Sequence, residues 1–219
     1  MSERPMIFSG DSVRAILDGR KTQTRRVIKF PVEKLAISKD KSWIKAVYQD
    51  GGGNWIGWSC DSPDLAEFTK KAYPSGEGFR CTYGVPGDRL WVRETWKEII
   101  DQGLGHNSVV YRASDGAWLG EKWRSPIFMP RWASRITLKI INIRAERLQE
   151  ISELDAISEG IEKINNHPHW AWKDYTGNGQ DLSPIFSYQS LWDTLNAKRG
   201  YPWESNPFVW VIGIKRIEF

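Results

Sequence analysis

Near the start of the chain, the apolar side chains first form a short continuous run and then recur at helical spacing. Residues Met6–Phe8 form a short apolar run that predicts a strand. Apolar side chains then recur at helical spacing as Val13, Ile16 and Leu17. Gly19 stands where a helix commonly ends. The pattern therefore predicts a helix over residues 11–18, followed by an extended segment over 21–28 that is rich in β-branched residues.

Three later segments have the pattern of core strands. Arg89–Trp96 alternates between polar and apolar side chains, and Ser134–Leu148 gives the longest strand pattern. Phe208–Ile214 is almost continuously apolar, which is typical of a central strand buried on both faces. Two further helices are expected, one capped by Ser152 and ending at Gly160 and one over Ser187–Leu195.

Polar and glycine-containing segments separate these elements. We expect a hairpin in which Trp43–Tyr48 pairs with Trp55–Trp58, because a glycine-rich turn lies between them. A second hairpin is expected around Val109–Arg112, a helix over Leu65–Tyr73 and a loop over 163–184. A single domain over residues 1–219 would carry insertions at about 31–80, 97–125 and 163–205.

The order of these elements bears on the fold class. Helices do not separate the strands regularly, so an all-parallel α/β sheet is disfavoured. The sequence predicts an α+β protein in which helices flank a small mixed or antiparallel β-barrel.

Composition narrows the class of protein. Hydrophobic residues make up 40% and charged residues 26% of the chain, as in folded soluble domains. No apolar run approaches the roughly 20 residues that span a bilayer, and the first residues do not resemble a secretory signal. Only two cysteines are present, Cys60 and Cys81, without a CxxC spacing. We therefore expect a reduced, cytoplasmic protein without a membrane partner.

Charge and aromatic content permit a nucleic-acid partner without requiring one. The net charge is +4, and the chain contains 13 tryptophans. Tryptophan fills cores and also stacks on bases, so most of these side chains are expected in the core and two or three at a ligand site.

The densest polar cluster lies at the end of the first predicted helix. Lys21, Thr24 and Arg26 belong to a segment with four cations in seven residues. A solvated basic helix exit would explain this composition. The alternative is an anion or nucleotide pocket, in which Lys21 is a point charge and Arg26 a planar fork for phosphate or carbonyl oxygen.

A second cluster covers residues 87–96. On a strand, Trp91 and Arg93 share one face, while the Glu94 carboxylate falls on the apolar face. A buried carboxylate needs a partner, and Lys21 or Arg26 is available. This pair would be either a structural ion pair or a pair that holds shifted protonation states at a working site.

The motif Gly19-x-Lys21-x-x-Thr24-x-Arg26 resembles the signature of the ASCH family, Gly-x-Lys-x-x-(Glu or Thr)-x-Arg. Blocks 6–26, 87–94 and 131–148 also stand in the order of that family. With residues 129–135 included, the layout is similar to the longer ASCH-type proteins found in prophages.

The resemblance implies a PUA-like barrel and two kinds of function. ASCH domains are similar to RNA-binding PUA barrels, and small bacterial members are amidohydrolases on N4-acetylcytidine that use a lysine, a threonine and a glutamate. By position these are Lys21, Thr24 and Glu94, of which Glu94 is matched only by its place on its strand. The insertions depart from the compact enzymes.

The implied mechanism assigns a role to each residue. The Thr24 hydroxyl attacks the amide carbonyl, Lys21 accepts its proton, and Glu94 orients Lys21 or protonates the leaving amine. Backbone N–H groups near Thr24 stabilise the oxyanion. Substrate binding is expected from arginines and tryptophans in these blocks: Arg26, Arg93, Arg131, Trp91 and Trp132.

Three functions stay open from the sequence. The first is an amidohydrolase on an acylated pyrimidine nucleoside, which needs no cofactor. The second is a non-catalytic module that binds RNA or a modified base, in RNA or DNA. The third is a phage-associated interaction or scaffold protein. A metal site at His167 and His169 is disfavoured, because His106 and the cysteines lie at unhelpful spacings. The sequence does not give an oligomeric state.

Overall fold

The structure is a computed structural model that describes most of the chain in nine segments. These are residues 2–29, 46–49, 55–58, 81–99, 108–115, 122–166, 169–177, 179–181 and 183–217. Several features of the sequence analysis lie outside these segments: the expected helix over Leu65–Tyr73, the turn at 50–54, Cys60, His106 and His167.

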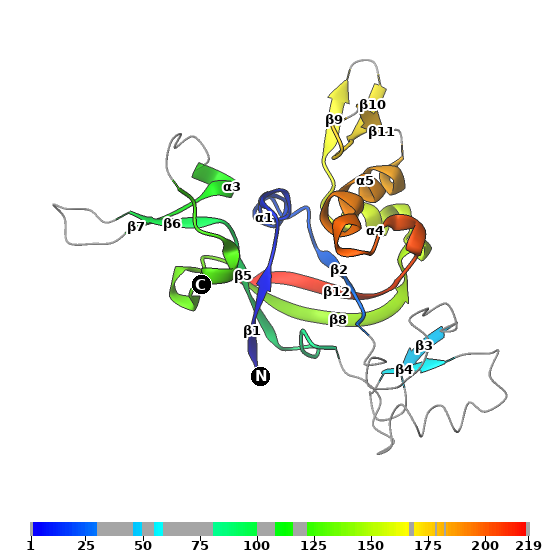
Figure 1. The fold of residues 1–219 in the computed structure, drawn as a ribbon, viewed down its shortest axis with the longest axis horizontal. Coiled ribbons are helices and arrows are strands. Elements are labelled where there is room, and N and C mark those ends of the chain that lie inside the picture. Colours follow the sequence, from blue (N-terminus) through cyan, green and yellow to red (C-terminus); the bar gives the residue numbers. More distant parts are fainter. Residues whose placement is uncertain are drawn as a thin grey trace.

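A five-stranded sheet forms the centre of the fold (Figure 1). Its order is β1-β5-β8-β12-β2, and only the β1–β5 pair is parallel. The strands are β1 (Glu3–Ile7), β5 (Arg89–Arg93), β8 (Thr137–Arg147), β12 (Phe208–Ile217) and β2 (Gln23–Val27). The expected α+β class is confirmed, with a mainly antiparallel sheet.

The sheet is open between its two edge strands. Within the described residues β1 and β2 are not paired with each other, so the expected closed barrel is not seen. One side chain crosses this opening: Arg26 on β2 donates a hydrogen bond from Nη2 to the carbonyl oxygen of Ile7 on β1, at 2.6 Å.

Helices α1 (Gly10–Leu17), α4 (Glu153–Ser158) and α5 (Pro184–Asn196) lie above β8 and β12 in the view of Figure 1. The expected helices are confirmed, and α5 begins at Pro184, before the expected Ser187. Ser9 caps α1 by accepting a hydrogen bond from the backbone N–H of Ser12.

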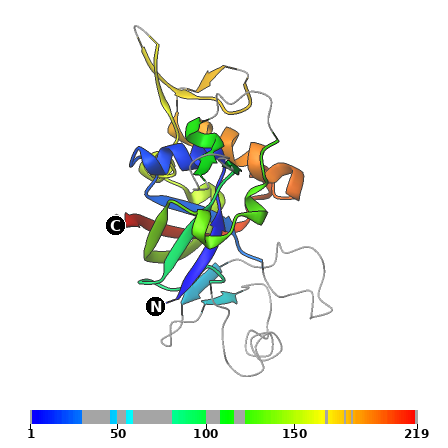
Figure 2. The same cartoon turned by 90° about the vertical axis from the view of Figure 1, so that its left-hand side faces the viewer.

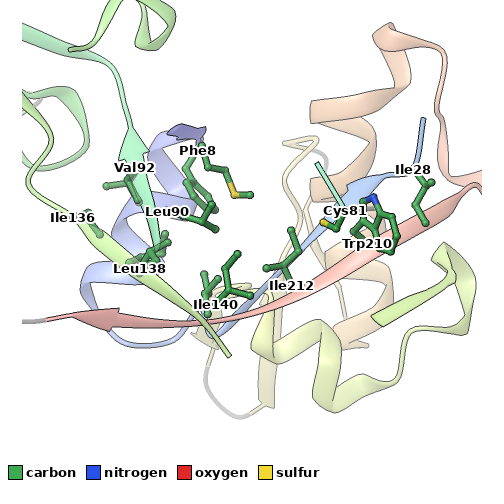
Figure 3. Close-up of a cluster of buried hydrophobic side chains, with 14 of the residues drawn as sticks. Phe8, Ile28, Cys81, Leu90, Val92, Ile136, Leu138, Ile140, Trp210 and Ile212 are labelled. Carbon is green, nitrogen blue, oxygen red and sulfur yellow. The ribbon is translucent and has the colours of Figure 1, made fainter. Parts of the chain in front are cut away.

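The central strand β12 is buried on both faces, as its apolar run predicts. Trp210 and Ile212 belong to a core cluster that also contains Leu138 of β8 and Val13 of α1. Figure 3 shows side chains of this cluster, among them Leu138, Trp210 and Ile212. Val209 and Val211 point into a second cluster with side chains of α5: Tyr188, Leu191 and Trp192. The two cores fix β12, and β12 in turn fixes β2.

Smaller sheets surround this centre. The two expected hairpins are confirmed as strand pairs, β3 (Ala46–Gln49) with β4 (Trp55–Trp58) and β6 (Trp96–Ile99) with β7 (Ser108–Tyr111). The short helices are α3 (Arg112–Asp115), η2 (Pro126–Phe128), η3 (Arg131–Ala133), η4 (Leu148–Glu150), η5 (Ala197–Arg199) and η6 (Trp203–Ser205).

Two local predictions are wrong. The segment Arg89–Trp96 is not one strand, because β5 ends at Arg93 and Trp96 begins β6 in another sheet. The expected loop over 163–184 contains a three-stranded sheet of β9 (Lys163–Asn166), β10 (His169–Lys173) and β11 (Gln180–Asp181). This sheet projects from the body of the molecule beyond α5 (Figures 1 and 2).

None of the helices in the described segments is both long and apolar enough to cross a bilayer.

Candidate functional site

A cavity of about 860 Å³ lies where the edges of the sheet face each other. Its walls come from the end of β1, from β2, and from α5 with the residues that follow it. Lys21, Thr24 and Arg26 all line it, so the structure places the three residues of the sequence motif in one site.

Three separate parts of the fold hold the backbone beside Lys21. The backbone N–H of Lys21 donates to the carbonyl oxygen of Ala15 in α1 at 2.9 Å. The N–H of Thr22 donates to the carbonyl oxygen of Ser158 in α4 at 2.9 Å. The carbonyl oxygen of Thr22 accepts a hydrogen bond from the N–H of Ile214 in β12 at 2.8 Å. Segments far apart in the chain therefore fix the backbone at residues 21–22, from which the Lys21 side chain extends to the cavity.

The Lys21 ammonium group is buried against Glu159. Its Nζ lies 2.8 Å from Oε2 and 2.7 Å from the backbone carbonyl oxygen of Glu159. Both side chains are only 3% exposed. Burial lowers the pKa of Lys21 from its usual value, because the ammonium form is desolvated, and the nearby charge of Glu159 opposes this shift without cancelling it. Lys21 is thus easier to deprotonate than an ordinary lysine.

Glu159 is shared with a buried arginine. Arg25 Nη1 lies 3.2 Å from Glu159 Oε1, and Arg25 Nη2 also pairs with Glu146 and, at 3.1 Å, with Asp155. The Arg25 side chain is 0% exposed. Burial works to lower the pKa of Arg25, but the carboxylates, Glu159 foremost, outweigh it and raise the pKa. The charge of Glu159 is therefore held from one side by Lys21 and from the other by Arg25.

Gly160 allows the end of α4 to approach Lys21. Its φ is +86°, in the left-handed region that favours glycine. A Cβ atom at this position would lie 2.7 Å from the Cβ atoms of both Ala15 and Lys21. The absence of a side chain at Gly160 thus lets Glu159 reach the lysine.

Replacing Gly160 with alanine is expected to separate α4 from Lys21 and to reduce any activity that uses this pair. Gly177→Ala is a matched control, because its φ is +87° but no atom lies within 4 Å of its added Cβ. Thermal or denaturant unfolding should show Gly160→Ala to be less stable than Gly177→Ala by about 1–3 kcal/mol. Equal stability of the two variants would contradict the proposed close contact.

Thr24 provides a hydroxyl group in the same cavity. It lies on β2 opposite Ile212 and is 4% exposed. The described residues offer its hydroxyl no hydrogen-bond partner, although it lines the cavity. A threonine hydroxyl without a competing hydrogen bond, in the same cavity as a lysine of lowered pKa, is a suitable nucleophile.

Glu94 lies elsewhere. Both of its carboxylate oxygens accept hydrogen bonds from Arg135, from Nε and Nη2, each at 3.0 Å. It is 2% exposed and does not line the cavity. The expected pairing of Glu94 with Lys21 or Arg26 is wrong, because the chain leaves β5 at Arg93 and the planar fork of Arg135 satisfies the buried carboxylate.

The sequence contains one signal that points to Glu159. It is the C-cap residue of α4, where the negative end of the helix dipole disfavours a carboxylate. A glutamate at that position directly before Gly160 needs a nearby cation, and Lys21 and Arg25 supply it.

The expected binding residues divide into two groups. Arg26 and Arg93 line the cavity, whereas Trp91, Trp132 and Arg131 do not. Trp91 is buried beneath the Arg93 guanidinium, Trp132 is 63% exposed, and Arg131 pairs with Glu3. The cavity takes its aromatic surface from residues that the sequence did not single out: Phe8, Tyr83, Tyr188, Trp192 and Tyr201.

No group of three or more histidine, cysteine, aspartate or glutamate side chains suited to a metal ion occurs among the described residues. A comparison of the chain with models of known families, with curated proteins and with solved structures finds no match.

Proposed function

We propose that this protein hydrolyses the amide of an N-acylated pyrimidine nucleobase, with N4-acetylcytidine as the first substrate to test. The observation that carries the proposal is the buried Lys21–Glu159 pair in the same cavity as the Thr24 hydroxyl, which has no hydrogen-bond partner among the described residues. The resemblance of residues 19–26 to the ASCH signature supports it, since hydrolases of that family use a lysine, a threonine and a glutamate. In this proposal Glu159 takes the role first assigned to Glu94.

The same resemblance supports a PUA-like origin of the fold. We propose that the open sheet is a variant of a PUA-like barrel, with the cavity in the opening between β1 and β2.

The proposed reaction has two steps. The Thr24 oxygen forms a bond to the acyl carbon and passes its proton to neutral Lys21. The bond from the acyl carbon to the exocyclic nitrogen breaks, and the departing amine takes the proton from Lys21. Water then hydrolyses the threonine ester and releases the carboxylic acid. Glu159 acts as a positioning residue that keeps the Lys21 nitrogen in place.

The lining of the cavity suits a nucleobase. Its volume lies within the range of roughly 300–1,000 Å³ that is typical of small-molecule sites. Tyrosine, tryptophan and phenylalanine side chains offer faces for stacking, and the surrounding cations would stabilise the negative charge that develops on the carbonyl oxygen.

The excess of cations in the cavity also favours the second candidate, a module that binds RNA or a modified base without turnover. This candidate uses the same cavity but gives Thr24 and Lys21 no chemical role, so a turnover assay separates the two.

The test is incubation of the protein with N4-acetylcytidine and a small panel of other acylated nucleosides, followed by liquid chromatography. We expect the intact protein to release cytidine and acetate, and Thr24→Val to release neither. Thr22→Val is the matched control, because Thr22 is exposed, lies outside the cavity and should leave turnover unchanged. The absence of product across the whole panel would count against the hydrolase and favour binding alone.

A further inference from the structure

The charges that line the cavity are unbalanced. One carboxylate, Glu159, faces six cationic side chains: Lys21, Arg25, Arg26, Lys29, Arg93 and Arg199. Glu159 is already bound by Lys21 and Arg25. The described part of the chain provides no carboxylate within 4 Å of the other four cations.

Arg26 is fixed in position with part of its guanidinium unused. One terminal nitrogen donates to Ile7, and the guanidinium carbon lies 5.1 Å from the centre of the Phe8 ring. Its Nε is buried without a hydrogen-bond partner among the described residues. Arg199 lines the same cavity. Burial lowers the pKa of Arg26, and the positive charge of Arg199 acts in the same direction.

Arg93 approaches the same end of β1 from the other side. Ile7 is its partner in the β1–β5 ladder, and the N–H of Phe8 donates to its carbonyl oxygen at 3.0 Å. The guanidinium carbon of Arg93 lies 4.6 Å from the centre of the Trp91 ring, so the guanidinium packs against the face of this ring. Its Nε is also buried without a partner, and its terminal nitrogens form no hydrogen bond within the described residues.

Such an arrangement is costly without a ligand. A buried donor that lacks a hydrogen bond destabilises the folded state, and such groups are rare in folded proteins. Two such donors, Arg26 Nε and Arg93 Nε, lie near residues 7–8. Their guanidinium groups are held in place because they pack against the rings of Phe8 and Trp91. Planar guanidinium groups bind phosphate oxygens in pairs of hydrogen bonds, and a phosphate would also offset the repulsion between Arg26 and Arg199.

We propose that Arg26 and Arg93, with additional charge from Arg199, form a phosphate subsite of the cavity, so that a nucleotide binds more tightly than the free nucleoside. The phosphate belongs either to a mononucleotide or to the backbone of a nucleic-acid strand. The inference rests on the proposed function only in placing the base near Lys21.

The test is titration calorimetry of the full chain at low salt with cytidine, cytidine 5′-monophosphate and a short single-stranded RNA that contains cytosine. We expect at least one phosphate-bearing ligand to bind roughly 10-fold more tightly than cytidine, as charge-assisted bidentate contacts would give. Arg93→Gln should remove that difference. Arg89→Gln is the matched control, because Arg89 lies on the same strand but outside the cavity, and it should retain the difference.

The two sources of phosphate give different results. Arg93-dependent binding of the monophosphate indicates a mononucleotide, whereas Arg93-dependent binding of the RNA alone indicates a strand. The subsite is overturned if phosphate gives no gain in affinity, if Arg93→Gln leaves the gain intact, or if none of the three ligands binds at millimolar concentration. Failure of the hydrolase proposal looks different, since acylated nucleosides would then stay intact while phosphate binding still depended on Arg93.

Discussion

Replacing Lys21 with methionine should lower kcat/KM on the acylated nucleoside by roughly 10²–10⁴-fold, the range that a positioned general base contributes. Methionine keeps most of the buried aliphatic volume and removes only the amine. Glu159 retains Arg25 at 3.2 Å, so the variant should still fold. Lys139→Met is the matched control, because Lys139 is exposed on β8 and lies outside the cavity.

The pH profile distinguishes a base from a structural lysine. Lys21 must be neutral to accept a proton, so kcat/KM should rise with pH through the lowered pKa of Lys21 and then level off. Glu159 stabilises the ammonium form, so Glu159→Gln should lower that pKa further and move the rise to lower pH. A profile that stays in place in Glu159→Gln would contradict the assignment of the base.

Arg25→Ala should destabilise the protein by about 3–5 kcal/mol, since it removes one partner from a buried ion-pair cluster. Three carboxylates would lose their shared cation: Glu146, Asp155 and Glu159. Arg144 would still pair with two of them. Denaturant unfolding at neutral pH measures the change, and Arg14→Ala is the control because the Arg14–Asp11 pair is exposed and should contribute less than about 1 kcal/mol.

Acid unfolding provides a second readout of the same cluster. Burial works to raise the pKa of Asp155, but Arg25 and Arg144 outweigh it and lower the pKa below its usual value. A lowered pKa in the folded state means that Asp155 stabilises the fold above its unfolded pKa of about 3.9, and that this stability is lost as pH falls below it. Arg25→Ala should reduce this acid-dependent loss. An unchanged dependence would show that Arg144 alone holds Asp155.

The core elements are predictable because burial imposes their periodicity. The helical spacing of Val13 and Ile16 and the apolar run of β12 follow from the faces that they bury. The end of β5 is not predictable in this way, because the alternation of side chains continues through Trp96, whereas β5 ends at Arg93 and Glu94 pairs with Arg135. The strands β9 and β10 have only four and five residues, and β9 is mostly polar, so the pair has no periodicity from which to predict it.

The site is predictable only where its residues are close together in the chain. Lys21, Thr24 and Arg26 belong to one short motif, and the structure places all three in the cavity. Glu159 comes from a helix far along the chain, and its contact with Lys21 depends on how α4 packs. Closure of the sheet is equally a tertiary property, which the strand patterns of β1 and β2 do not determine.

The position of β12 in the sheet has a consequence for the order in which the chain folds. β2 carries Thr24 and Arg26, and in the central sheet β12 is its neighbour, so the ladder pairs residue 24 with residue 212. During synthesis β2 leaves the ribosome before β12, so its backbone hydrogen bonds to β12 can form only later. Such long-range pairing slows folding. A nascent chain that stops short of β12 should therefore carry the complete sequence motif and still lack a formed site.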